Sequence, residues 1–218
     1  MEFKIDIKIF LIALVFLLVN QIYMYILFMT FAIIHECFHL LAGIILGYKV
    51  KSIRIMPLGL SIAFNEKEEE YNAKIKRSNF NNVKKIIILL MGPISNIVIA
   101  FFFMLLNMAI PVYINILIAI FNLLPIYPLD GGQILNRVLR IIYGNFEAYK
   151  ISNSVNNIIM SILTALAIIG LLCTKTIAIL FILIFLWYLI IKENKKYKEI
   201  SKYFKSFHKL DKKSNYNI

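Results

Sequence analysis

The feature that most constrains this chain is an apolar run of about 40 residues near the N-terminus, at roughly positions 7–47. Residues 9–34 contain no charged side chain. As a single helix the run would be about 60 Å long, twice the ~30 Å hydrocarbon core of a bilayer. We therefore expect two membrane helices, divided near Asn20-Gln21. Between residue 9 and Tyr48 the ionisable residues, tyrosines aside, are His35, Glu36, Cys37 and His39.

The composition excludes a soluble fold. The chain of 218 residues is 61% hydrophobic and 17% charged, whereas a soluble domain is about 45–50% apolar and about 25% charged. A soluble chain of this size keeps a large surface in contact with water, so its core cannot hold all of these apolar side chains. Two cysteines in separate apolar runs give no disulfide framework. A soluble enzyme, a disordered protein and a disulfide scaffold are excluded.

We predict an all-α polytopic membrane protein with about six transmembrane helices and a small membrane-associated β-hairpin after the second. Residues 49–64 partly alternate between polar and apolar, which predicts the hairpin, with Pro57-Leu58-Gly59 as its turn. Residues 65–82 are polar and read as a solvated loop. Residues 1–191 form the core and 192–218 a basic tail. The expected spans lie at about 7–19, 21–47, 86–107, 112–128, 155–173 and 176–191.

The basic residues fall on one side of this topology. Of the 24 Lys and Arg residues, 23 lie in the N-terminus, the 48–85 and 129–152 segments and the tail, and one lies in the 174–175 turn. The positive-inside rule makes the common face cytoplasmic, with both termini on it. The net charge of +12 is thereby explained without nucleic acid, and the lipid bilayer is the expected surrounding.

His35-Glu36-Cys37-Phe38-His39 is an HExxH motif inside the second expected span. Residues four apart share one face of a helix, so both imidazoles can reach one metal ion, and Glu36 lies where it can take a proton from a metal-bound water. Ionisable groups in a membrane helix cost about 2.5–3.5 kcal/mol each on insertion scales, and a zinc ion would offset that cost. The alternative is polar contacts between helices, with the groups hydrogen-bonded to one another.

Asp130 is the candidate third ligand, since zinc with two His ligands needs one more protein ligand and leaves a position for water. It follows two prolines at the end of the fourth expected span, and Gly131 and Gly132 follow it. Irregular backbone at membrane depth is tolerated where it lines a buried or watery site. The six-span topology brings Asp130 and the HExxH motif to similar depth on the cytoplasmic side. The alternative is an ordinary turn residue at a helix end broken by proline.

These motifs together resemble the site-2 protease family of intramembrane zinc metalloproteases, peptidase family M50. The resemblance covers about residues 1–192 and rests on the HExxH motif, on NLLPIYPLDGG at 122–132 and on GPISN at 92–96, which is similar to the family's GPxxN element. It implies one zinc ion bound by His35, His39 and Asp130, with Glu36 as catalytic base. It also implies that Asn122 holds the substrate or the oxyanion, while the sequence leaves ordinary helix packing open for Asn122.

The short first span looks most like the sporulation-type, SpoIVFB-like branch of endospore formers. That likeness implies a membrane-associated sigma factor precursor as substrate, membrane-bound inhibitory regulators as partners, and the bacterial cell membrane, or the membrane around the forespore, as location. We expect no CBS or PDZ domain, which leaves nucleotide regulation without its sensor. The alternatives are a site-2-type protease for another membrane-tethered regulator, or a zinc transporter or metal-binding scaffold. An extended substrate could bind to the edge of the hairpin as an additional β-strand. The alternative is that the hairpin is a plain surface element.

Overall fold

The computed structural model describes residues 2–5, 13–14, 16–18, 20–56, 59–64, 75–174, 183–184, 186–188, 190–199 and 201–202. The chain divides into two compact units, Met1–Leu124 and Pro125–Ile218. The first unit holds β1 (Glu2–Ile5), α2 (Ile22–Ile45), β2 (Val50–Met56), β3 (Gly59–Phe64), α3 (Ile75–Leu105) and α4 (Ala109–Leu123). The second holds α5 (Asp130–Tyr143) and α6 (Asn145–Thr174), and further helical residues lie between 183 and 202.

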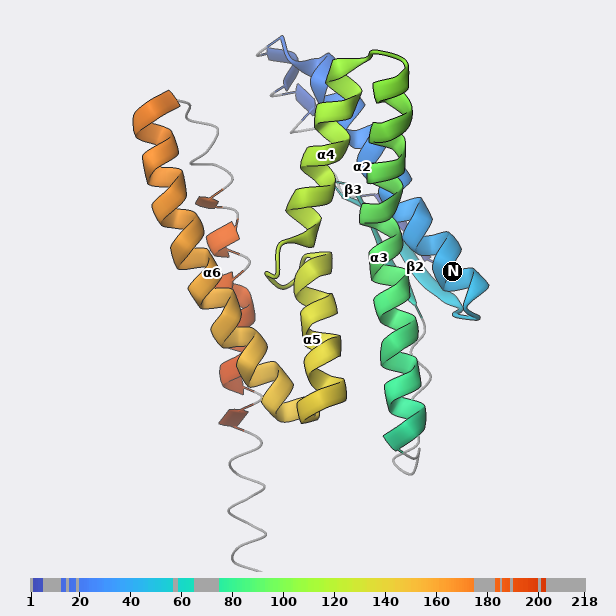
Figure 1. The fold of residues 1–218 in the computed structure, drawn as a ribbon, viewed down its shortest axis with the longest axis vertical. Coiled ribbons are helices and arrows are strands. Elements are labelled where there is room, and N and C mark those ends of the chain that lie inside the picture. The colour runs from blue at the N-terminus through green and yellow to red at the C-terminus, as the bar shows by residue number, and fades with distance from the viewer. Residues whose placement is uncertain are drawn as a thin grey trace, which may run out of the picture. The chain divides into compact units, whose positions relative to one another are not determined.

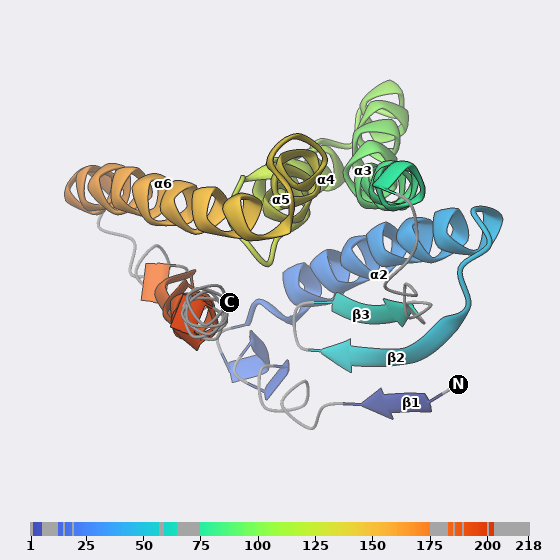
Figure 2. The ribbon, with the colours of Figure 1, turned by 90° about the horizontal axis from the view of Figure 1, so that it is seen from below.

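The first unit places α2 between a sheet and two helices. Figure 2 shows β3 and β2 along one side of α2 and α3 on the other. The sheet has the order β1-β2-β3, with β2 and β3 antiparallel and β1 parallel to β2. The sequence predicted strands within 49–64, and their turn at Pro57-Leu58 lies outside the described residues. β1 was not predicted.

Small residues let α2 approach its neighbours. A Cβ atom at Gly43 would overlap the ring of Phe64, the last residue of β3. The Phe64 ring therefore lies directly against the α2 backbone, and it also packs edge-on against the ring of Tyr48. This contact fixes the end of β3 against the helix that carries the HExxH motif.

The apolar helices match part of the predicted topology. Within the part of the chain that the structure describes, three helices are long and apolar enough to cross a membrane, by length and composition: 22–45, 79–105 and 145–170. α4 is apolar but has only 15 residues. Large apolar side chains point outward along α3, among them Val98, Phe101 and Phe102, each more than half exposed. Such a continuous apolar surface favours a membrane location.

Three boundaries differ from the sequence prediction. The predicted loop 65–82 is wrong over 75–82, because α3 already begins at Ile75 and carries polar residues on its first turns. α4 ends at Leu123 and not at 128, since Pro125 and Pro128 disfavour a continuing helix. α6 begins at Asn145, ten residues before the predicted 155. The predicted spans 7–19 and 176–191 lie partly outside the described residues.

Residues in the left-handed conformation follow α2 and α3, and α3 is joined to α4 by a short connection (Figure 1). Gly47 has φ 84°, its N–H donates to the Ile44 carbonyl, and the N–H of Tyr48 donates to the Gly43 carbonyl. This paired pattern is a Schellman motif, which satisfies the last carbonyls of a helix. Asn20 and Asn107, both with φ 56°, repeat it before α2 and after α3. The turn at Asn20 lies at the position where we divide the first apolar run into two spans.

Candidate metal centre

The two imidazoles of the HExxH motif lie together on the buried face of α2. His35 is 2% exposed and His39 is 6% exposed. The rings meet edge to face, with centroids 4.7 Å apart, and their Nε2 atoms are 3.1 Å apart. Two nitrogen ligands of a tetrahedral zinc ion, each about 2.0–2.1 Å from the metal, would be about 3.3 Å apart. The spacing of the two nitrogens therefore fits a shared metal ion.

Both rings are held from the far side by α3. The Nδ1–H of His39 donates to the backbone carbonyl of Ile88 over 2.7 Å. A carbonyl can only accept, so Nδ1 carries the proton of a neutral ring and Nε2 presents a lone pair. The Nδ1 of His35 makes a 2.6 Å hydrogen bond with the side-chain amide of Asn96. Outer hydrogen bonds of this kind orient histidines that bind metals.

Gly92 gives the imidazoles their room. A Cβ atom at this position would overlap the Cε1 and Nε2 atoms of His39 and the Nε2 atom of His35. The bare α3 backbone thus forms one wall of the space where the two nitrogens converge. The predicted GPxxN element contributes at both ends, because Gly92 makes the space and Asn96 holds a ring.

Glu36 and Asn122 belong to the same unit. Glu36 follows His35 on α2 and is half-buried. Asn122 lies one residue before the end of α4, is half-buried, and its amide donates to the Ile118 carbonyl over 3.1 Å. That bond uses one of the two hydrogens of the amide NH2 group, which has a second hydrogen that can be donated.

Asp130 is the first residue of α5 in the second unit. The residue is 8% exposed, and it lies at a helix N-terminus, where the helix dipole stabilises negative charge. The turn before it is tight, because a Cβ atom at Gly132 would overlap the backbone of Ile126 and Tyr127. The N–H of Leu129 donates to the Ile126 carbonyl over 2.8 Å. Gly132 is thus required for the irregular loop that carries Asp130.

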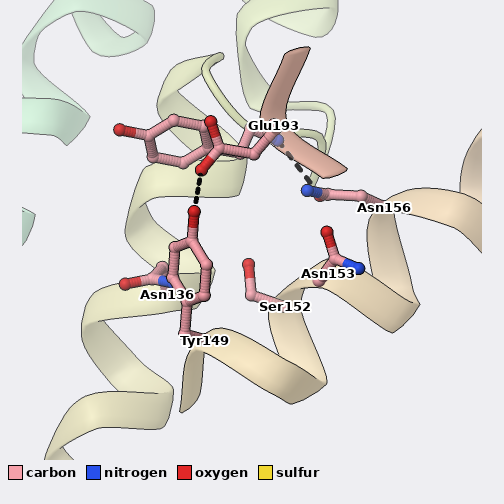
Figure 3. A pocket seen from close by; sticks show the side chains of 7 residues that line it. Asn136, Tyr149, Ser152, Asn153, Asn156 and Glu193 are labelled. Carbon is pink, nitrogen blue, oxygen red and sulfur yellow. Dashed lines mark hydrogen bonds between the residues drawn. The ribbon is translucent and has the colours of Figure 1, made fainter. Parts of the chain in front are cut away.

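A buried asparagine of α6 holds this loop. The backbone N–H of Tyr127 donates to the side-chain oxygen of Asn156, which is 2% exposed, over 3.1 Å. Figure 3 shows Asn156 beside Asn153 and Ser152 on α6, with the Tyr149 hydroxyl donating to Glu193. Sequence reasoning missed these residues, although asparagines within an apolar helix are a usable signal.

Comparisons with known proteins identify the family. A sequence profile of peptidase family M50 matches residues 23–112 and 106–170. The chain belongs to this family. It is 27% identical over 160 residues to a zinc metalloprotease of Methanocaldococcus jannaschii, a match that covers 72% of the chain and 45% of that relative. The chain thus spans about half the length of that curated M50 relative.

A solved structure shows the same fold. The site-2 protease from Methanocaldococcus jannaschii aligns with a TM-score of 0.64 and 19% sequence identity, over 88% of this chain and 91% of the other. The M50 assignment and the apolar helices together indicate a membrane protein. His35 and His39 in the first unit, and Asp130 in the second, are all buried, and their side chains are of the types that bind zinc.

Replacing Gly92 with alanine tests the wall of the metal site. Alanine normally stabilises a helix by about 1 kcal/mol relative to glycine, but here the methyl group must displace both rings. We expect zinc affinity to fall at least about 10-fold, the lower end for disturbed support of a ligand. Val98→Ile, which adds a methyl group to the exposed face of the same helix, is the control. Unchanged zinc affinity in Gly92→Ala, measured by chelator competition, would contradict the site.

Replacing Asn156 with alanine tests the loop before Asp130. The Tyr127 N–H would lose its acceptor, and a buried unsatisfied donor costs about 1–3 kcal/mol. We expect a lower midpoint of thermal unfolding in detergent. Asn157→Ala is the control, because it removes an exposed hydrogen bond that the side chain of Asn194 donates to the side-chain oxygen of Asn157. This replacement should lower the midpoint far less. Equal effects of the two variants would show that Asn156 has no special role in holding the loop.

Proposed function

We propose that this chain is an intramembrane zinc metalloprotease in which His35, His39 and Asp130 bind one zinc ion. The observation that carries the proposal is the convergence of two buried Nε2 atoms at 3.1 Å, within an apolar helix and against a glycine. Membership of peptidase family M50 supports peptide-bond hydrolysis as the reaction. Asp130 is the third donor that such a site requires, and its carboxylate is the one Asp or Glu that the NLLPIYPLDGG motif offers.

The residues of the chain divide the chemistry as follows. A bound zinc ion supplies Lewis-acid activation of water and of the scissile carbonyl. The Glu36 carboxylate takes the proton from the attacking water and delivers it to the nitrogen of the leaving amine, so that it acts first as base and then as acid. Glu36 follows His35 directly on α2 and is half-buried.

Asn122 is proposed as the group that holds the substrate carbonyl or the developing oxyanion. Its amide has two hydrogens, and the bond to Ile118 uses one. A donor directed at developing negative charge is worth about 100–1000-fold in rate in other enzymes. The bond to Ile118 also orients the amide at the end of α4.

The proposed substrate is the membrane segment of a membrane-associated regulator, and more finely a sigma factor precursor during sporulation. The motif resemblance to the sporulation-type branch motivates the finer proposal. The outer edge of β3 is the proposed docking strand, because an extended peptide can add to it and expose a bond that a helix would shield. The distribution of Lys and Arg supports a cytoplasmic location for both termini and for the site.

Replacing Glu36 with glutamine separates metal binding from catalysis. We expect about one zinc ion per chain to remain and cleavage to fall at least about 100-fold, because general base catalysis is lost. Producing this variant in place of the wild type and comparing protein N-termini would reveal the substrate as the species that stays uncut. A protein that keeps its cleavage activity would refute the mechanism. An uncut species other than a sigma factor precursor would refute the sporulation assignment.

Replacing Asn122 with alanine tests its role in the reaction. We expect kcat to fall about 100-fold with zinc content unchanged, as for a lost oxyanion donor. A role in helix packing alone predicts the opposite pattern, a lower thermal midpoint with kcat preserved. Single-turnover cleavage and thermal unfolding, measured on the same preparation, distinguish the two outcomes.

A further inference from the structure

A chain of buried amides leads from His35 to the backbone of α4. Asn96 donates through its Nδ2 to the Oδ1 of Asn115 over 2.9 Å, and Asn115 donates through its Nδ2 to the carbonyl of Pro111 over 2.9 Å. Asn96 and Asn115 are both 0% exposed. Asn115 lies outside the HExxH, GPxxN and LDGG motifs.

The donor-to-acceptor direction of these hydrogen bonds is fixed at the Pro111 carbonyl. The Pro111 carbonyl can only accept, so the group of Asn115 that faces it must be the NH2 group. The oxygen of Asn115 then faces Asn96 and can only accept, which makes the NH2 group of Asn96 the donor there. The oxygen of Asn96 is therefore the atom that faces His35, although the amide of an isolated asparagine could point either way.

The consequence reaches the metal-binding nitrogen. Because the oxygen of Asn96 can only accept, the Nδ1 of His35 must carry the proton, and the Nε2 of the neutral ring presents a lone pair. In the other tautomer, a proton on His35 Nε2 would donate to His39 Nε2 across 3.1 Å. That internal hydrogen bond would occupy both nitrogens.

We propose that Asn115 is a positioning residue, which acts through Asn96 to hold His35 in the tautomer that binds metal. The proposal rests on the proposed function, since it assigns the metal to the Nε2 atoms. Asn115 is a residue of α4 that is hydrogen-bonded to Asn96 and to Pro111, and it is connected to His35 through Asn96. Its effect is to direct the Nε2 lone pairs of His35 and His39 toward the same point, as binding of one shared metal ion requires.

The test compares two replacements of Asn115 that differ in hydrogen bonding. Asn115→Leu keeps the size and removes both bonds, which frees the Asn96 amide to turn. Asn115→Asp, in its neutral form, can accept from Asn96 and donate to Pro111, and so preserves the direction. We expect zinc affinity, measured by chelator competition in detergent, to fall about 10–100-fold in Asn115→Leu. We expect it to stay within about 3-fold of wild type in Asn115→Asp, as for a substitution that keeps the outer hydrogen bond.

A double-mutant cycle distinguishes positioning from general packing. If Asn115 acts through Asn96, then Asn115→Leu lowers zinc affinity little further in an Asn96→Leu background, whereas independent effects add. Thr30→Ala is the control, since the Thr30 hydroxyl donates to the Ile26 carbonyl of its own helix α2, outside this series of amides. It should leave zinc affinity unchanged. Nitrogen-15 spectra of the metal-free protein should show the His35 proton on Nδ1 in the wild type and partly on Nε2 in Asn115→Leu.

The outcomes separate this proposal from the proposed function. Wild-type zinc affinity in Asn115→Leu, additive effects in the cycle, or an unchanged His35 tautomer would overturn the role of Asn115 while leaving the protease assignment intact. A wild-type protein that binds no zinc through His35 and His39 would overturn both. Loss of affinity in Asn115→Leu with rescue in Asn115→Asp would support the positioning role.

Discussion

A polar group removed from water must find its partner inside the protein, and in an apolar helix bundle that requirement organises the rest of this structure. The imidazoles of His35 and His39 are held by α3 through an amide and a backbone carbonyl. Each of these partners bonds to the Nδ1 atom of a ring and thereby directs the Nε2 atom toward the other imidazole. The arrangement of α2 against α3 is therefore set by hydrogen bonds at the site as much as by apolar contact, which in lipid gives little driving force between helices.

The same requirement explains why asparagine recurs where the helices meet. Its side chain both donates and accepts, so it can pass a direction along a chain of bonds, as Asn96 and Asn115 do. It can satisfy an irregular backbone, as Asn156 does for Tyr127. It also tolerates the left-handed conformation that ends a helix, as at Asn20 and Asn107. Asparagine thus satisfies buried polar groups of the protein in three different ways.

The sequence was most informative where spacing and chemistry coincide. HExxH predicted two imidazoles on one helix face, and the 3.6-residue period made that placement certain once α2 was helical. Glycine spacing could not reveal that Gly92 lies against both rings, because that contact joins segments more than 50 residues apart. For the same reason β1 was missed, since four residues at the N-terminus gain strand structure only from pairing with β2. The start of α3 at Ile75 was missed because polar turns of a helix resemble a loop in composition.

The pairing of β1 with β2 has a consequence for association. It covers one side of β2, and within the described residues the two outer edges of the sheet are those of β1 and β3. Two copies that joined their sheets at β3 would use the same backbone groups that an extended peptide would use. Self-association through this edge and capture of a peptide would then exclude each other, and the concentration of the protein in the membrane would itself set how much of the edge is open.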